Sequence, residues 1–225
     1  MTIEIWSDYA CPFCYIGEKK LARALDEIDD KNITVEFKSF ELDPEASSKV
    51  ESSTPERFAL KYGLSLEAAN ERIEQISRMG RDEGIDFRYA TTRYTNTFDA
   101  LRLTKLAQEN GHDEIITKLF DAYFTKNLEL SDHAVLKKIA DDCELDSDDV
   151  DKVLNGDRYA KEVRADELQA ARLGIHSVPY FVIDRKYGLS GAQPSEILKK
   201  AITDALTEEK FSGMACGADG CHFDG

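Results

Sequence analysis

The stretch IEIWSDYACPFCYIGEKK, residues 3–20, decides the fold. Its first six residues have the composition of a short strand. Cys11 and Cys14 follow with two residues between them, and apolar residues then recur at helical spacing. Over residues 33–38 apolar and polar residues alternate, as in a half-buried strand. The first 40 residues therefore predict a strand–helix–strand unit with a CxxC pair at the start of the helix.

The CxxC spacing suits thiol–disulfide exchange, in which one thiolate attacks and a second thiol resolves the mixed disulfide. At a helix start, unpaired amides and the helix dipole stabilise negative charge on the first sulfur. Pro12 fits the first turn because it has no N–H to lose. Cys14 is expected one turn further in, shielded but within reach of Cys11. Asp8 is a candidate proton acceptor for Cys14, since the resolving thiol must lose its proton.

Composition limits the class of protein. The chain has 225 residues, 42% of them hydrophobic, which is enough for one or two domains with a real core. Its 44 acidic and 29 basic residues give a net charge of -15, which disfavours nucleic acid and anionic lipid as partners. No apolar run is long enough to span a bilayer. The residues from Met1 to Trp6 resemble a strand and not a secretory signal, which predicts a cytoplasmic protein.

The rest of the chain predicts helices followed by a hairpin and a last helix. Helical periodicity dominates from about residue 53 to 155, with Thr54 as the expected first N-cap. A helix, a buried strand, its hairpin partner and a final helix ending near Leu206 follow. The fold class is therefore α/β, a thioredoxin-like fold with an inserted α-helical domain. The expected division is 1–45 with 157–207 as the thioredoxin-like domain, 46–156 as the insertion, and 208–225 as a flexible Gly/Cys tail.

Val178 and Pro179 form a second element, directly before the buried strand. A proline at a strand start removes a ladder donor without penalty. In thioredoxin folds the loop opposite the CxxC pair carries a cis proline, and the residue before it offers its free N–H and C=O to an extended peptide. Together with the CxxC pair, this position predicts a cis Val178–Pro179 bond.

The segments WSDYACPFCYIG and GIHSVPYFVID, about 165 residues apart, resemble the DsbA family, and most closely its FrnE branch of cytoplasmic members. The resemblance covers nearly the whole chain. It implies a thiol–disulfide oxidoreductase with Cys11 as nucleophile and Cys14 as resolving cysteine. Strongly oxidising members commonly have His at the position of Phe13. The substrate-binding positions it implies are Pro12, Phe13, Val178 and Pro179.

The expected substrates are cysteine-containing proteins or small thiols, and the redox-active disulfide needs no dissociable cofactor, with glutathione as a candidate co-substrate. An alternative is a glutathione-dependent isomerase or transferase of the same fold, like the 2-hydroxychromene-2-carboxylate isomerases and kappa-class transferases. Those proteins commonly have Ser in place of Cys11 and lack a counterpart of Cys14. A third hypothesis is a metal-holding or chaperone module built on the tail cysteines.

Other side chains carry weaker signals. Cys216 and Cys221 lie in a glycine-rich tail. The alternatives for them are an accessory redox pair that exchanges with the CxxC pair, an inert pair, a weak metal site with His222, or a zinc site shared with the CxxC pair. Cys143 is expected to be a small buried hydrophobe. His176 is close to the proline loop and is a candidate for substrate contact, whereas Trp6 and Tyr9 are expected mainly in the core.

Overall fold

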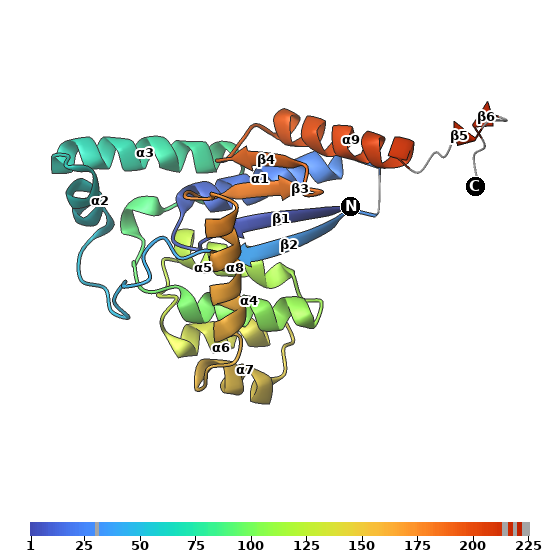
Figure 1. Cartoon of the computed structure of the whole chain (residues 1–225). Helices are drawn as coiled ribbons and strands as arrows, with labels where there is room; N and C mark the ends of the chain where they lie inside the picture. Colours follow the sequence, from blue (N-terminus) through green and yellow to red (C-terminus); the bar gives the residue numbers. More distant parts are fainter. Residues whose placement is uncertain (30–31, 213–215, 218–219, 222–225) are drawn as a thin grey trace.

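The computed structural model describes residues 1–29, 32–212, 216–217 and 220–221, with side chains described as far as Glu208. The elements are β1 (Thr2–Ser7), α1 (Pro12–Asp26), β2 (Thr34–Ser39), α2 (Thr54–Tyr62), α3 (Leu66–Asp82), a 3-10 turn η1 (Tyr89–Thr91), α4 (Phe98–Glu109), α5 (Glu114–Phe124), α6 (His133–Asp141), α7 (Ser147–Leu154), α8 (Ala160–Arg172), β3 (Tyr180–Ile183), β4 (Tyr187–Ser190), α9 (Ser195–Ser212), β5 (Cys216–Gly217) and β6 (Gly220–Cys221). Figure 1 shows their arrangement.

Four strands form a mixed sheet in the order β2-β1-β3-β4. β1 pairs in parallel with β2 and antiparallel with β3, with Trp6 opposite Tyr180. Because β1 and β3 are neighbouring strands that run in opposite directions, the end of β1 and the start of β3 lie at the same end of the sheet. This register brings the CxxC segment and the Val178–Pro179 segment together, although about 165 residues separate them in the chain.

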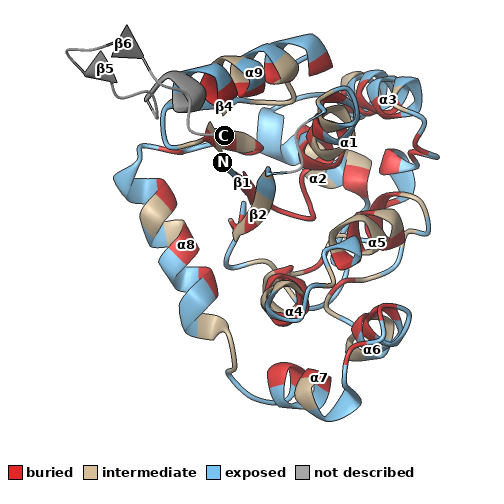
Figure 2. Ribbon diagram, turned by 90° about the vertical axis from the view of Figure 1, so that its right-hand side faces the viewer, coloured by how far each residue is buried: buried red, intermediate tan, exposed pale blue. Residues whose placement is uncertain are grey.

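The two faces of the sheet have different coverings. Ile3 and Ile5 point into an apolar cluster beneath α1 and α9, as the alternation of side chains along a strand requires. Trp6 points to the opposite face, where its indole N–H donates to the carbonyl oxygen of Asp166 in α8 at 3.0 Å. The buried faces of the surrounding helices turn inward (Figure 2). α1 therefore packs along one face of the sheet, and its first turn lies at the end of the sheet where β1 ends.

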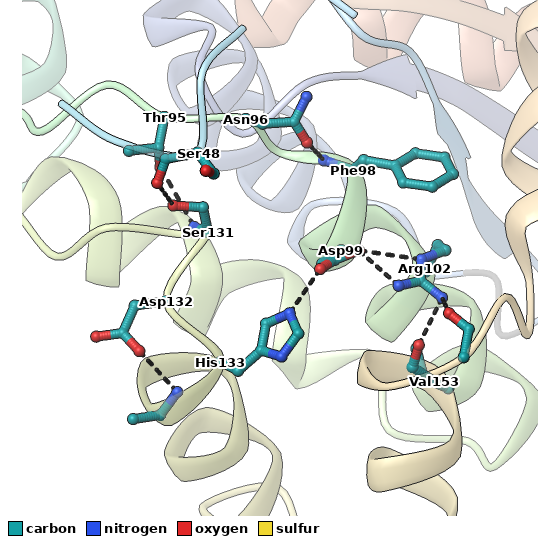
Figure 3. A network of polar contacts seen from close by, with 12 residues as sticks. Ser48, Thr95, Asn96, Phe98, Asp99, Arg102, Ser131, Asp132, His133 and Val153 are labelled. Carbon is teal, nitrogen blue, oxygen red and sulfur yellow. Dashed lines mark hydrogen bonds and ion pairs between the residues drawn. The ribbon is translucent and has the colours of Figure 1, made fainter. Parts of the chain in front are cut away.

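Between β2 and α8 the chain forms the helices α2 to α7. A buried arginine ties part of this layer together (Figure 3). The guanidinium of Arg102 in α4 donates to the carbonyl oxygens of Val153 and Gly156, at 2.5 and 2.9 Å, and thereby satisfies the C-terminal end of α7. Asp99 joins Arg102 to His133, whose Nε2 lies 2.7 Å from the carboxylate. This network of charged groups holds α4, α6 and α7 in place.

The α/β fold with a helical insertion is as the sequence predicts, but two boundaries were predicted wrongly. The N-cap of α2 is Ser53 and not Thr54, because Ser53 and Glu56 exchange hydrogen bonds in a capping box. α9 continues beyond Leu206 to Ser212. No glycine or proline interrupts residues 207–212, so the helical pattern has no stop signal there.

The longer α9 also determines where the C-terminal segment begins. Lys199 pairs with Glu27 at the C-terminal end of α1 at 2.8 Å, and Glu208 accepts a hydrogen bond from the hydroxyl of Tyr187 at 2.7 Å. Tyr187 lies opposite Ile183, which pairs with Ile3 near the start of β1. α9 therefore ends on the side of the molecule where β1 begins (Figure 1), the opposite end of α1 from Cys11.

Candidate active site

Cys11 is the N-cap residue of α1, and Pro12 occupies the first helical position. The backbone turns sharply here, since the Cys11 N–H donates to the Asp8 carbonyl oxygen at 3.0 Å and the Cys14 N–H to the Cys11 carbonyl oxygen at 3.1 Å. The Cys11 side chain makes no capping hydrogen bond to the helix. Its sulfur is therefore not engaged by the helix backbone, although only 4% of the Cys11 surface is exposed.

The loop before β3 lies directly against this sulfur. The Cys11 thiol donates to the carbonyl oxygen of Val178 at 3.4 Å, and the Val178–Pro179 peptide bond is cis. Gly17, one turn beyond Cys14, permits this contact between α1 and the loop. A Cβ atom at Gly17 would lie only 3.0 Å from Cγ of Pro179. The residues Cys11, Pro12, Val178 and Pro179 thus form one site.

Cys14 is buried, with 2% of its surface exposed, and faces a different environment from Cys11. Burial, together with the neighbouring Cys11 thiol, raises its pKa well above the usual range, although a hydrogen bond to Ser7 opposes the rise. A second, smaller cavity of about 210 Å³, lined in part by Ser7 and Glu18, lies on the Cys14 side. Cys14 is therefore a protonated thiol in the resting reduced protein, shielded behind Cys11.

Asp8, the expected proton acceptor, is fully engaged by other groups. Its carboxylate accepts hydrogen bonds from the backbone N–H of Ala10 at 3.1 Å and of Leu42 at 2.7 Å, and from the Thr97 hydroxyl at 2.9 Å. Burial nevertheless raises its pKa. Because these partners come from three separate segments, Asp8 joins the active-site loop to the chain after β2 and to the start of α4.

A cavity of about 700 Å³ opens beside Cys11, between the active-site loop and helices α2 and α3. Phe13, with 36% of its surface exposed, lies at this cavity. Val178 and His176 line it as well, so His176 is in a position to contact a substrate. Cys11 is one of the residues that line this cavity, so a ligand bound there would lie beside it.

The remaining candidate residues either are buried in the protein core or have side chains that lie outside the described residues. Trp6 and Tyr9 are completely buried, and Cys143 is 1% exposed, as predicted for core residues. Cys216 and Cys221 are opposite each other in the β5–β6 pair, but their side chains lie outside the described residues. Within the described part of the chain, no group of three or more His, Cys, Asp or Glu side chains is arranged to hold a metal ion.

Three cations that were not predicted from the sequence also line the cavity: Arg57 and Lys61 in α2, and Arg72 in α3. The spacing of Arg57 and Lys61, four residues apart, places both on one helix face and was a usable signal. What the sequence could not show is that this face turns toward Cys11, because no local pattern specifies how α2 and α3 dock.

The strand order and the two thiols at the start of α1 define a thioredoxin-fold protein with a dithiol site. Residues 2–203 match the model of the DSBA-like thioredoxin domain, and the chain belongs to this family. It is 37% identical to a probable DsbA oxidoreductase, SCO1869, from Streptomyces coelicolor, with a TM-score of 0.88 and full coverage of both chains.

Two more distant structures share the fold. The first is a 2-hydroxychromene-2-carboxylate isomerase, 12% identical with a TM-score of 0.70, covering 95% of this chain and all of the other. The second is the cytosolic disulfide reductase DsbM from Pseudomonas aeruginosa with GSH, 15% identical with a TM-score of 0.63, covering 92% of this chain and all of the other. At these identities the likeness shows a shared fold. None of the helices in the described part of the chain has the length and apolar character needed to cross a membrane.

Proposed function

We propose that this protein is a thiol–disulfide oxidoreductase in which Cys11 is the nucleophile and Cys14 the resolving cysteine. The observation that carries the proposal is the different setting of the two thiols. Cys11 lines an open cavity at a helix start, with 4% of its surface exposed, whereas Cys14 does not line that cavity, is 2% exposed and has a pKa raised by burial. Exchange chemistry requires this division between an accessible attacking sulfur and a shielded second one.

In the direction of substrate reduction, the Cys11 thiolate attacks one sulfur of a disulfide. A mixed disulfide forms, and the first substrate thiolate leaves and takes up a proton. Cys14 then gives up its proton and attacks the Cys11 sulfur, which releases the second substrate thiol and leaves a Cys11–Cys14 disulfide. Two electrons pass from the dithiol to the substrate, and oxidation of a substrate dithiol is the reverse sequence.

The proposed substrates are cysteine-containing proteins or small thiols. No described group hydrogen-bonds to the Val178 N–H, and its carbonyl oxygen faces Cys11, so an extended peptide can pair with this residue. The thiol pair itself carries the electrons, so we propose that the protein needs no dissociable cofactor. We propose glutathione as a co-substrate. The net charge of -15 disfavours nucleic acid and anionic membranes as partners. The resemblance to the cytosolic reductase DsbM supports a cytoplasmic location.

Single cysteine variants test this proposal. We expect Cys11→Ser to abolish catalysed reduction of insulin, and Cys14→Ser to accumulate mixed disulfides through Cys11, detected by non-reducing mass spectrometry. Cys143→Ser is the matched control, since Cys143 is a buried cysteine that does not line the cavity. Its activity should equal that of the unmodified protein. If Cys11→Ser retained the activity, the isomerase or transferase alternative would replace the dithiol mechanism.

A further inference from the structure

The cavity beside Cys11 is positively charged, although the protein as a whole is acidic. Arg57, Lys61 and Arg72 line it, and no Asp or Glu is among its described lining residues. The whole chain has 44 acidic residues against 29 basic ones. The local excess of positive charge is therefore opposite in sign to the net charge of -15.

Among the described residues, these three cations also have no ion-pair partner. Every arginine of the chain forms an ion pair with a described carboxylate except Arg57, Arg72 and Arg172, and two of these three line the cavity. The Nε atom of Arg57 is buried and has no hydrogen-bond partner among the described residues. Lys61 likewise has no described carboxylate partner. An unpaired cation in the wall of the cavity that Cys11 also lines is available to a ligand that brings its own negative charge.

The contacts that Arg57 and Arg72 make are with uncharged groups and leave their positive charge uncompensated. The guanidinium of Arg57 lies 3.7 Å from the centre of the Tyr94 ring, a cation–π contact. Arg72 donates to the neutral Gln75 amide oxygen at 2.8 Å. Tyr94 in turn donates its hydroxyl to Asp43 at 3.2 Å, which fixes the ring beneath Arg57.

The dimensions of the cavity suit a small molecule. Its volume of about 700 Å³ lies within the range of roughly 300–1,000 Å³ typical of small-ligand sites. Most of the wall is apolar, with Phe58, Ile76, Met79 and Tyr89 among the lining residues. Such a wall accepts the methylene groups of a ligand, and the cations are few and separate, as expected for groups that orient a ligand by its charged ends.

We propose that the thiol pair reacts preferentially with small disulfides and thiols that carry carboxylates, and that Arg57, Lys61 and Arg72 determine this preference. The proposal rests on the thiol–disulfide exchange proposed above. In the exchange, the reduced protein and one disulfide RSSR give the Cys11–Cys14 disulfide and two RSH. The cations bind the carboxylate of the R group and leave the sulfur chemistry unchanged.

Three disulfides of similar size and different charge provide the test. The reduced protein is mixed with 3,3′-dithiodipropionate, 2-hydroxyethyl disulfide or cystamine, which are anionic, neutral and cationic. Acid quenching, alkylation and mass spectrometry then give the rate at which the Cys11–Cys14 disulfide forms. Each rate is divided by the rate of the same disulfide with dithiothreitol, which removes differences in intrinsic reactivity.

The expected order of normalised rates is anionic, then neutral, then cationic. Unit charges about 6 Å apart in water interact by about 0.7 kcal/mol, which is roughly threefold in rate for each cation. We therefore expect Arg57→Gln, Lys61→Gln and Arg72→Gln each to slow the anionic disulfide about threefold relative to the neutral one. Arg172→Gln removes an unpaired arginine that does not line the cavity and should leave the ratio unchanged. Added salt at 1 M should reduce the preference.

The outcomes separate the two proposals. Equal normalised rates, or a preference for cystamine, would overturn the inference and leave the exchange activity standing. Failure of all three disulfides to oxidise the Cys11–Cys14 pair would instead refute the proposed function. The order of rates in the unmodified protein decides the inference even if a variant fails to fold, and an acidic protein without the local cations would favour the cationic disulfide.

Discussion

Gly17→Ala tests whether the contact between α1 and the Pro179 loop is as close as the structure has it. An added Cβ would lie 3.0 Å from Cγ of Pro179 and 3.2 Å from Cζ of Phe181, so the neighbours must shift. Overpacking of this kind costs about 1–3 kcal/mol. The change from Gly to Ala within a helix gains about 1 kcal/mol. We therefore expect the free energy of unfolding to fall by about 0–2 kcal/mol.

The measurement is chemical denaturation of the reduced protein, followed by circular dichroism. Ala22→Gly is the matched control, because Ala22 is exposed on the same helix and reports the helix preference alone. It should lose about 1 kcal/mol. If Gly17→Ala were instead more stable by the full 1 kcal/mol, the added methyl group would meet no crowding. The close contact between α1 and the proline loop would then be refuted.

Two further predictions concern Asp8 and the tail. Burial raises the pKa of Asp8 above its ordinary value of 3.8. Between the pKa of the unfolded state and that of the folded state, the folded protein therefore holds a proton that the unfolded chain has lost. The free energy of unfolding falls as pH rises through this range, by at most about 1.4 kcal/mol per pH unit. In Asp8→Asn this fall in stability should be missing when chemical denaturation is compared from pH 4 to 7. A pH profile identical to that of the unmodified protein would contradict the prediction. The tail pair Cys216 and Cys221 should form an accessory disulfide adduct with Cys11 of a second chain in Cys14→Ser. From the end of α9 to the start of β5 there are four Cα–Cα steps, which reach at most about 15 Å, less than the 22 Å or so of α1. Adducts that form at the same rate on dilution would show exchange within one chain.

Local sequence signals predicted most of the fold. The strand, the CxxC pair and the helix at the N-terminus follow from apolar periodicity, and the same holds for α4, α5 and the hairpin after Pro179. The end of α9 was missed because residues 207–212 continue the helix without a stop signal. Ser53 was missed as a cap because Thr54 and Ser53 are both good capping residues, and only the reciprocal bonds with Glu56 distinguish them.

The site residues that belong to a recognisable sequence motif were predictable. Cys11, Cys14 and the Val178–Pro179 pair belong to two recognisable segments. The partners of Asp8 at Leu42 and Thr97 were not predictable, because they come from distant loops whose approach is a tertiary property. The same reason hid the cations of the cavity, which depend on how α2 and α3 pack over the active-site loop.

The mixed sheet has a consequence for how such a protein can diversify. The antiparallel pairing of β1 with β3 sets the distance between the Cys11 segment and the Val178 loop, and none of the residues in that pairing belongs to α2 or α3. Substitutions, and even exchange of residues 54–82 between relatives, can therefore reshape the wall around the sulfur while the reacting atoms keep their places. The proposed reactive centre and the proposed substrate-selecting wall therefore come from different segments of the chain, so the wall can change in evolution without a change in the thiol chemistry.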